Sequence, residues 1–267
     1  MNSESTRRLR SGREMPVLGL GTWQLTSDTA GAVEDAIGLG YRMIDTSGDY
    51  GTQPGVGEGI RRSGIARDEI YVVTKVEETD DAYDATRRDL DELGLDHVEL
   101  MLIHRPPPSG AGEALWEGLL RARDEGLTAD IGVSNYSRSQ MERLAQASGE
   151  MPAVNQVEWT PFAWSREMLD FCREHEINIQ AYSPLTHGKR LDDGRLGDLA
   201  SRTGGTPAQV LLRWNLQLGT VALPKANDPD HRRENLDVFD IELDQAEMQV
   251  LGTLNEQASA LGSLPYT

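Results

Sequence analysis

Asp45, Tyr50, Lys75 and His104 are residues of the types that together can transfer a proton to a carbonyl oxygen. A tyrosine phenol has a pKa of about 10 and is a poor acid at neutral pH, but an adjacent ammonium group stabilises the phenolate and lowers that pKa. Lys75 can supply the ammonium group, Asp45 can fix and neutralise it, and His104 can hydrogen-bond the substrate oxygen. Each of these residues alone is commonly structural. The chemistry therefore depends on whether the fold brings the four together.

All four residues lie at or just beyond the carboxyl ends of short apolar or β-branched segments. Eight such segments predict strands over residues 17–21, 42–45, 70–74, 98–104, 129–134, 154–157, 178–182 and 220–223. Polar residues also follow the later segments, at Ser134, Asn135, Gln156, Tyr182 and Lys225. If the strands are parallel and close into a barrel, these side chains meet at one mouth, where barrel enzymes hold their active sites.

Helical segments alternate with the strands and carry apolar residues at a spacing of three or four. The clearest cover residues 29–39, 81–93, 138–147, 166–175, 208–218 and 245–254. Strand–helix order throughout implies parallel strands, and an eight-fold barrel uses about 250 residues. The sequence therefore predicts the α/β fold class, with residues 1–267 forming a single (α/β)8 TIM barrel domain.

Some segments fall outside this alternation. Residues 6–10 and 13–16 flank Ser11-Gly12, which predicts an N-terminal β-hairpin with a two-residue turn that closes the bottom of the barrel. The loops 105–112 and 184–206 are longer than the usual connections and should lie over the mouth. The tail after Leu254 is short, so we expect a fairly open pocket.

The charge balance limits the possible partners. The 267 residues carry 26 basic and 44 acidic side chains, a net charge of −18, which argues against nucleic acid or an anionic membrane as a partner. An anionic cofactor would then need a local cluster of cations. Lysine occurs only as Lys75, Lys189 and Lys225, and two of these follow predicted strand ends. The low lysine content is typical of codon bias in a GC-rich genome or of adaptation to salt, but a chain that drifts from lysine to arginine should keep lysine where a compact ammonium group with a tunable pKa is required.

Cysteine and targeting signals point to the cytoplasm. Cys172 is the only cysteine, so no intramolecular disulfide is possible, and a small core residue is the favoured interpretation. Residues 1–11 are polar and arginine-rich, unlike a signal peptide. No apolar run approaches the roughly 20 residues that a membrane span needs. We expect a cytoplasmic protein.

Eight motifs in this order make the chain resemble an aldo-keto reductase over essentially its full length. They are VLGLGTW at 17–23, YRMIDTSGDYG at 41–51, VVTKV at 72–76, LMLIHRP at 100–106, IGVSNY at 131–136, VNQVEWTPF at 154–162, INIQAYSPL at 177–185 and LPKANDPDHRREN at 223–235. The resemblance implies an (α/β)8 barrel that reduces aldehydes or ketones with a nicotinamide cofactor. It also implies a monomer, because most members of the family are monomeric.

The resemblance assigns roles residue by residue. Tyr50 would be the general acid, Lys75 and Asp45 would tune it, and His104 would orient the carbonyl group. Ser134, Asn135 and Gln156 would hold the nicotinamide carboxamide, and Tyr182 would stack on its ring. Further cofactor contacts would come from Gly21, Thr22, Trp23 and Asp45, from Ser183, Pro184 and Leu185 along the pyrophosphate, and from Lys225, Ala226, His231, Glu234 and Asn235 at the adenosine end. Trp23, Tyr50, His104 and Arg105 would line the substrate pocket.

Several positions depart from the family pattern. Arg105 stands where tryptophan often follows the catalytic histidine, and Thr52-Gln53 replaces a frequent Asn-Glu. Ala226 replaces a common serine, and His231 replaces the arginine expected near the 2′-phosphate. Lys225 remains as a cation there, with Arg232 as a second candidate. NADPH is the favoured cofactor, with NADH also usable.

Two other functions fit the sequence less well. A metal-dependent barrel hydrolase would need grouped ligands at strand ends, often as His-x-His. The five histidines are scattered at 97, 104, 175, 187 and 231, so we expect no metal site. A reductase-like binding protein with little turnover is disfavoured by the intact set of four catalytic residues. Gly19-Leu20-Gly21 lacks the third glycine of a dinucleotide fingerprint and suggests tight packing instead, whereas Trp159 suits a pocket wall or the core equally well.

Overall fold

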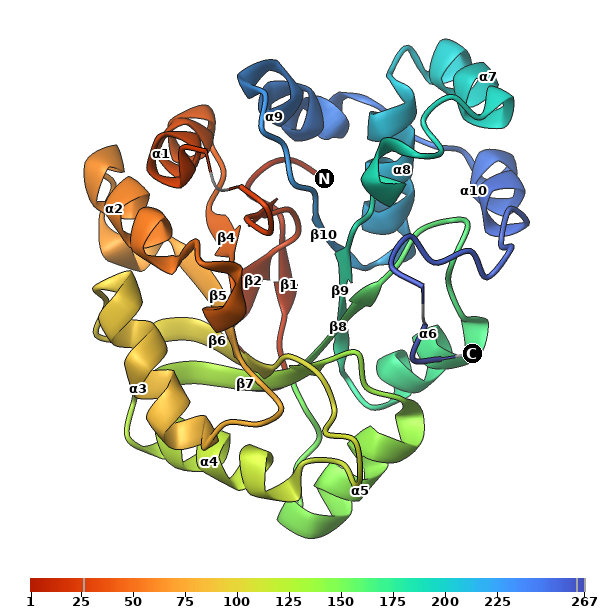
Figure 1. Ribbon diagram of the computed structural model, residues 1–267. Helices are drawn as coiled ribbons and strands as arrows, with labels where there is room; N and C mark the ends of the chain where they lie inside the picture. Colours follow the sequence, from red (N-terminus) through yellow and green to blue (C-terminus); the bar gives the residue numbers. More distant parts are fainter. Residues whose placement is uncertain (26, 263, 267) are drawn as a thin grey trace.

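The computed structural model describes residues 1–25, 27–262 and 264–266. One eight-stranded sheet holds the parallel strands in chain order: β3 (Leu20–Gly21), β4 (Met43–Asp45), β5 (Tyr71–Val76), β6 (Val98–Ile103), β7 (Thr128–Ser134), β8 (Val154–Glu158), β9 (Asn178–Tyr182) and β10 (Val221–Leu223). A parallel bridge between Leu18 and Ala222 joins the first segment to the last and closes the sheet. The predicted (α/β)8 barrel is confirmed, and Figure 1 shows the ring of strands inside a ring of helices.

The helices cover the outside of the barrel (Figure 1). They are α1 (Thr29–Leu39), α2 (Gln53–Ser63), α3 (Ala82–Leu93), α4 (Glu113–Asp124), α5 (Arg138–Ser148), α6 (Arg166–Glu174), α7 (Gly194–Thr203), α8 (Pro207–Leu218), α9 (Pro229–Leu236) and α10 (Gln245–Gly252). The sequence did not single out α2, α4, α7 or α9. Helix α2 was missed because of its glycines, which are unfavourable inside a helix. A Cβ at Gly57 would lie 1.8 Å from the Leu93 carbonyl oxygen, so glycine at this position permits a close approach to α3.

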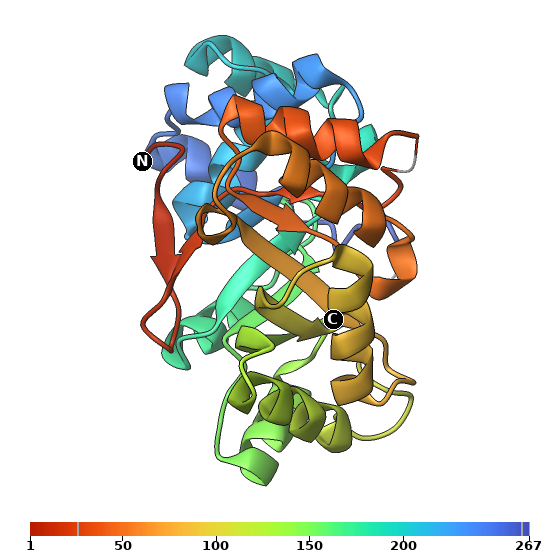
Figure 2. The same ribbon diagram turned by 90° about the vertical axis from the view of Figure 1, so that its left-hand side faces the viewer.

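The N-terminal hairpin closes the amino end of the barrel. Strands β1 (Thr6–Arg8) and β2 (Glu14–Pro16) are antiparallel, and Figure 2 shows them at one end of the barrel. Met15 is fully buried, and its sulfur lies 3.1 Å from Gln180 Nε2 inside the barrel. The predicted two-residue turn is wrong, because the Leu9 amide bonds to the Arg13 carbonyl and the Gly12 amide to the Leu9 carbonyl. The turn is therefore wider than Ser11-Gly12.

Alternate residues of each strand face the barrel interior and the helices. Met43, Val73, Leu102 and Leu223 form the interior cluster with Met15. A Cβ at Gly19 would lie 2.8 Å from Met43 Cε and 2.9 Å from Leu223 Cδ2, so the glycine there serves tight packing, as predicted.

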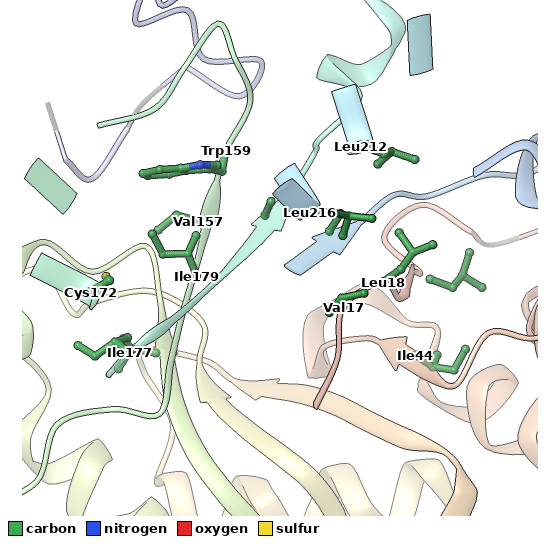
Figure 3. Packing of buried hydrophobic residues seen from close by; sticks show 14 of the residues in the cluster. Val17, Leu18, Ile44, Val157, Trp159, Cys172, Ile177, Ile179, Leu212 and Leu216 are labelled. Carbon is green, nitrogen blue, oxygen red and sulfur yellow. The ribbon is translucent and has the colours of Figure 1, made fainter. Parts of the chain in front are cut away.

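The outer faces of the strands pack against the helices. Val157 and Ile179 lie on adjacent strands, on the side of the barrel wall where Cys172 of α6 lies (Figure 3). Burial raises the pKa of the Cys172 thiol to about 12, so this cysteine is a core residue, as predicted, rather than a nucleophile. No helix in the described ranges is long and apolar enough to cross a bilayer.

The C-terminal tail folds back across the carboxyl end of β8. The buried Glu158 carboxylate accepts hydrogen bonds from Ser259 Oγ at 2.7 Å and from the Ala260 amide at 2.6 Å. The Tyr266 hydroxyl donates to the Glu158 carbonyl oxygen at 2.6 Å. The Tyr266 ring packs edge-on against the Trp159 ring. Trp159 is fully buried and belongs to the core. The tail thus packs against the carboxyl end of β8, and the openness of the pocket stays a prediction.

Candidate active site

A buried ion pair lies at the carboxyl ends of β4 and β5. Lys75 Nζ is 2.9 and 3.0 Å from the two Asp45 carboxylate oxygens and 2.6 Å from the Thr46 carbonyl oxygen, and the Lys75 side chain is fully buried. Burial alone would lower the pKa of Lys75, but the Asp45 carboxylate and the Tyr50 phenol outweigh it and raise that pKa. Lys75 is therefore a charged ammonium group inside the barrel.

Tyr50 ends the short helix η1 (Gly48–Tyr50), which follows β4. Its ring centroid lies 4.9 Å from Lys75 Nζ. Burial raises the pKa of the Tyr50 phenol, the Lys75 ammonium lowers it, and the net direction is upward. The expected sign of the lysine's contribution is right, but the expected net fall is wrong, because burial is the larger effect. The phenol is protonated at neutral pH, and Lys75 limits the cost of its ionisation.

His104 follows β6 and is nearly buried. Its ring lies edge-on to the Tyr50 ring, with centroids 5.7 Å apart. Its Nδ1 atom is 2.7 Å from Glu77 Oε1 and 3.2 Å from Ser47 Oγ. The structure thus brings all four predicted residues to one place. It adds Glu77, which the sequence analysis missed although the spacing of two from Lys75 puts both on one face of the extended chain.

Arg105, predicted as a pocket residue, belongs to an ion-pair network beside His104. Its guanidinium nitrogens lie 3.4 Å from Asp49, 3.5 Å from Glu77 and 3.7 Å from Glu78 carboxylate oxygens. Ligand-type atoms of Asp49, Glu77 and His104 come within 4.8 Å of one another. Arg105 supplies the positive charge for these carboxylates, so we interpret the group as an ion-pair network rather than as metal ligands.

The residues expected around the nicotinamide form a hydrogen-bonded shelf at the ends of β7, β8 and β9. Ser134 Oγ donates to the Gln156 carbonyl at 2.8 Å, and the Tyr182 hydroxyl donates to Asn135 Oδ1 at 2.8 Å. Asn135 has a left-handed backbone (φ 63°), and its side-chain amide donates to the His104 carbonyl oxygen at 3.1 Å. The shelf is therefore joined to His104.

Gln156 also links the shelf directly to the ion pair. Its Nε2 atom donates to Asp45 Oδ2 at 2.7 Å and to Gln180 Oε1 at 2.9 Å. On the other side, Thr22 Oγ1 donates to the Asp45 carbonyl at 2.9 Å, and the Gly21 amide bonds to the Pro224 carbonyl at 3.0 Å. Asp45 is thus held at its carboxylate by Gln156 of β8 and at its carbonyl oxygen by Thr22, which follows β3.

The loop after β9 carries the residues expected along the pyrophosphate. Ser183 has a left-handed backbone (φ 48°), and its hydroxyl lies 2.8 Å from His187 Nε2. The His187 ring stands edge-on to Trp23 at 5.5 Å, and Trp23 is 38% exposed. Pro184 is buried and Leu185 is half-buried. The loop is thus held in place through an aromatic side chain that follows β3.

Lys225 stands apart from the other cations. It is half-buried, burial lowers its pKa, and it forms no ion pair with any residue in the described part of the chain. In a chain of net charge −18, a partly buried ammonium group without a counter-ion fits an anionic ligand such as a dinucleotide phosphate. The amide-rich shelf suits a carboxamide, so the residues present fit a nicotinamide dinucleotide.

Arg232 does not serve as a second phosphate ligand. Its guanidinium bonds to Asp35 Oδ2 at 2.8 Å and to the carbonyl oxygens of Ala226 and Asn227 at 3.1 and 2.9 Å. The side chain is 3% exposed. The Nε and Nη1 hydrogens are thus taken by protein partners and the side chain is buried, which argues against the expectation that Arg232 is available to a phosphate.

The other residues expected at the adenosine end lie on or beside α9. His231 is exposed, and Asn235 is buried. The Glu234 carboxylate accepts from the Thr206 hydroxyl, and its carbonyl oxygen accepts from Gln209 Nε2 at 2.9 Å. Glu234 thus fixes α9 to α8.

Comparisons with known proteins agree with this geometry. The model of the Aldo/keto reductase family matches residues 17–256. An aldo-keto reductase of Mycobacterium tuberculosis is 42% identical over 254 residues, 93% of this chain and 90% of that protein. An aldo/keto reductase structure from Brucella melitensis has a TM-score of 0.89 at 38% identity, covering 94% of this chain and 99% of its own. A Bombyx mori aldo-keto reductase in complex with NADP has a TM-score of 0.91 at 30% identity, covering 97% and 95%.

Proposed function

Because the chain belongs to the aldo/keto reductase family and is an NAD(P)H-dependent oxidoreductase, we propose that it reduces small aldehydes and ketones to alcohols with Tyr50 as the general acid. The observation that carries this proposal is the Lys75 ammonium group, which is paired with Asp45 and lies 4.9 Å from the Tyr50 ring. His104 stands beside the same ring at 5.7 Å. A carbonyl oxygen between Tyr50 and His104 would meet a proton donor and an orienting group together.

Each residue has a defined task in this reaction. The bound nicotinamide cofactor supplies the hydride that the carbonyl carbon receives. Tyr50 donates its phenolic proton to the oxygen, and Lys75 stabilises the phenolate that forms. Asp45 keeps Lys75 charged and in place, because a buried ammonium group without a carboxylate would lose its proton more easily. Positioned acid catalysis of this kind contributes on the order of 10²–10⁴-fold.

The cofactor is assigned to the shelf and to the loops beside it. Ser134, Asn135 and Gln156 would hold the carboxamide, Tyr182 would stack on the nicotinamide ring, and Lys225 would meet the 2′-phosphate. NADPH is then the preferred cofactor, which is supported by the NADP complex of the silkworm relative. The preference is small and NADH is usable, because Arg232 is held by Asp35 and His231 carries no fixed charge.

We assign this activity to a monomer in the cytoplasm. The family resemblance supports the monomer, and the single buried Cys172 suits a reducing compartment. Size-exclusion chromatography with light scattering tests the first assignment. Imaging of the tagged protein in its own cell tests the second.

The variant Tyr50→Phe tests the proposed function. It removes only the phenolic hydroxyl, so carbonyl reduction should fall by about 10²–10⁴-fold while cofactor affinity, measured by fluorescence titration, stays close to wild type. Tyr83→Phe is the matched control, since it removes a phenolic hydroxyl that bonds to Glu125 outside the barrel. The measurement is cofactor oxidation over a panel of aldehydes, ketones and dicarbonyls. Retention of more than about a tenth of the activity would show that Tyr50 is not the acid.

A further inference from the structure

We propose that Glu77 is a positioning residue that keeps a hydrogen on His104 Nδ1, so that Nε2 donates a hydrogen bond only when the ring carries both protons. The proposal rests on the role given above to His104 in carbonyl reduction. It concerns a carboxylate that the sequence motifs do not assign to the site. Its consequence is that reduction and oxidation require opposite protonation states of one histidine.

The groups around His104 Nδ1 are acceptors. Glu77 Oε1 lies at 2.7 Å, Ser47 Oγ at 3.2 Å and Asp49 Oδ1 at 3.6 Å. The Ser47 hydroxyl donates its hydrogen to Glu77 Oε1 at 3.1 Å, so its oxygen faces His104 with lone pairs only. An ionised carboxylate also accepts only. The hydrogen of the short contact must therefore come from Nδ1 of the ring.

The carboxylate of Glu77 is ionised in this environment. Burial alone would raise its pKa, but hydrogen bonds from His104 and Ser47 and the charge of Arg105 outweigh burial, and the net direction is downward. Arg105 lies 3.5 Å from Glu77 Oε2, the oxygen that does not face His104. Glu77 thus has one oxygen for the histidine and one for the arginine. This arrangement holds its plane and makes it a fixed acceptor.

The tautomer determines what Nε2 can do. A carbonyl oxygen only accepts hydrogen bonds, so Nε2 must carry a proton to bind it, and with Nδ1–H fixed the ring is then an imidazolium. An alcohol also has a hydrogen to donate, so a neutral ring with a free Nε2 lone pair can bind the alcohol. Reduction should therefore weaken, and alcohol oxidation strengthen, as the ring loses its second proton.

Several charged groups surround His104. The groups facing the ring are Asp49, Tyr50, Lys75 and Arg105, with Glu78 behind Arg105. The pKa values of Tyr50 and Lys75 are raised from values that already lie above neutral pH, so both groups stay protonated there. The guanidinium group of Arg105 stays charged. Histidine is the side chain that ordinarily titrates between about pH 5 and 8. Asp89, whose pKa burial raises to about 7, lies against Gly48 of the short helix that carries Tyr50, so the pH profile is interpreted only through the difference between wild type and Glu77→Gln, which share Asp89.

The test combines nuclear magnetic resonance with pH-dependent kinetics. In ¹⁵N-histidine-labelled wild-type protein, the ring signals of His104 are assigned as those that are absent from the spectrum of His104→Ala. The neutral ring should carry its proton on Nδ1, and in Glu77→Gln it should populate the Nε2–H form, because an amide can also donate to Nδ1. In wild type, kcat/KM for reduction should fall about tenfold per pH unit above the transition, whereas Glu77→Gln should lose most of that slope.

The matched control is Glu78→Gln, which removes the adjacent carboxylate without touching His104 and should keep the wild-type tautomer and slope. A neutral wild-type ring with its proton on Nε2 overturns the proposal, and so does an equal slope in wild type and Glu77→Gln. The tautomer is measured without turnover. A protein that shows the Nδ1–H form but reduces no carbonyl would refute the proposed function and leave this inference intact.

Discussion

Removal of the Lys75 ammonium group should reveal a stability cost that is separate from its chemistry. The variant Lys75→Met leaves the Asp45 carboxylate inside the barrel with one remaining side-chain donor, Gln156 Nε2 at 2.7 Å. Two contacts at 2.9 and 3.0 Å are lost from its oxygens. Breaking a buried ion pair from one side costs about 3–5 kcal/mol. We expect a loss of that size in the free energy of unfolding at pH 7, a large part of a typical total of about 5–15 kcal/mol.

The double variant Lys75→Met/Asp45→Asn separates the two effects. A neutral amide at position 45 no longer leaves a charge in the barrel, so stability should return to within about 1–2 kcal/mol of wild type. Activity should not return, since no ammonium group faces Tyr50 in either variant. Urea denaturation and aldehyde reduction measured on the same preparations give the two quantities.

Two results would refute this reasoning. If Lys75→Met cost less than about 1 kcal/mol at pH 7, Asp45 would not be an ionised carboxylate held by the lysine. If the double variant regained activity together with stability, the lysine would be structural, and its proposed action on Tyr50 would fail. Arg88→Met is a suitable control, because it breaks an ion pair with Asp80 in which the arginine is 54% exposed. Its effect on stability should be no more than about 1 kcal/mol.

Two further predictions concern other parts of the chain. Burial raises the pKa of Asp89 on α3 to about 7, so part of the wild-type free energy of unfolding is lost as pH rises from 4 to 7. In urea denaturation, Asp89→Asn should stabilise the protein at pH 8 by up to roughly 4 kcal/mol and leave the free energy of unfolding at pH 4 unchanged. Equal stabilities of variant and wild type at pH 8 would contradict the raised pKa. Lys225→Ala should raise KM for NADPH more than KM for NADH. His231→Arg should lower KM for NADPH by no more than the factor that corresponds to a binding free energy of about 1.5–3 kcal/mol. Equal effects of Lys225→Ala on KM for both cofactors would contradict the assignment of this lysine to the 2′-phosphate.

The strand pattern and the convergence of the candidate residues could be predicted because both follow from local rules. A parallel barrel places the residues after every strand at one mouth, so the strand assignments alone bring Asp45, Lys75 and His104 together. Only the ends of the strands differ, as in β5, which runs to Val76 rather than to Thr74. Helix α9 escaped prediction because its sequence, PDHRRENL, has almost no apolar residue to set a period.

The missed features depend on partners far away in the chain. The sequence offered Arg232 as a second cation for the phosphate, but its Nε donates to Asp35, 197 residues away, and its Nη1 donates to two carbonyl oxygens of its own loop. The position of the C-terminal tail could not be predicted, because it depends on hydrogen bonds of Ser259 and Ala260 with Glu158, which lies more than a hundred residues earlier in the chain. The net direction of the Tyr50 pKa likewise required the extent of burial, which a motif does not specify. Pairing and burial are properties of the folded chain.

The three lysines of the chain differ in their partners, and two of them lie at the proposed site. Lys75 pairs with Asp45 and faces Tyr50, and Lys189 donates to the Ala260 carbonyl oxygen in the tail. Lys225 forms no ion pair within the described ranges. Many arginines of the chain, by contrast, are held by carboxylates, as in the pairs of Arg67 with Glu99 and Arg123 with Glu150. Burial alone disfavours this ammonium group, and no ion pair within the described ranges offsets that effect, so a bound phosphate would supply a counter-ion that the chain itself does not place there.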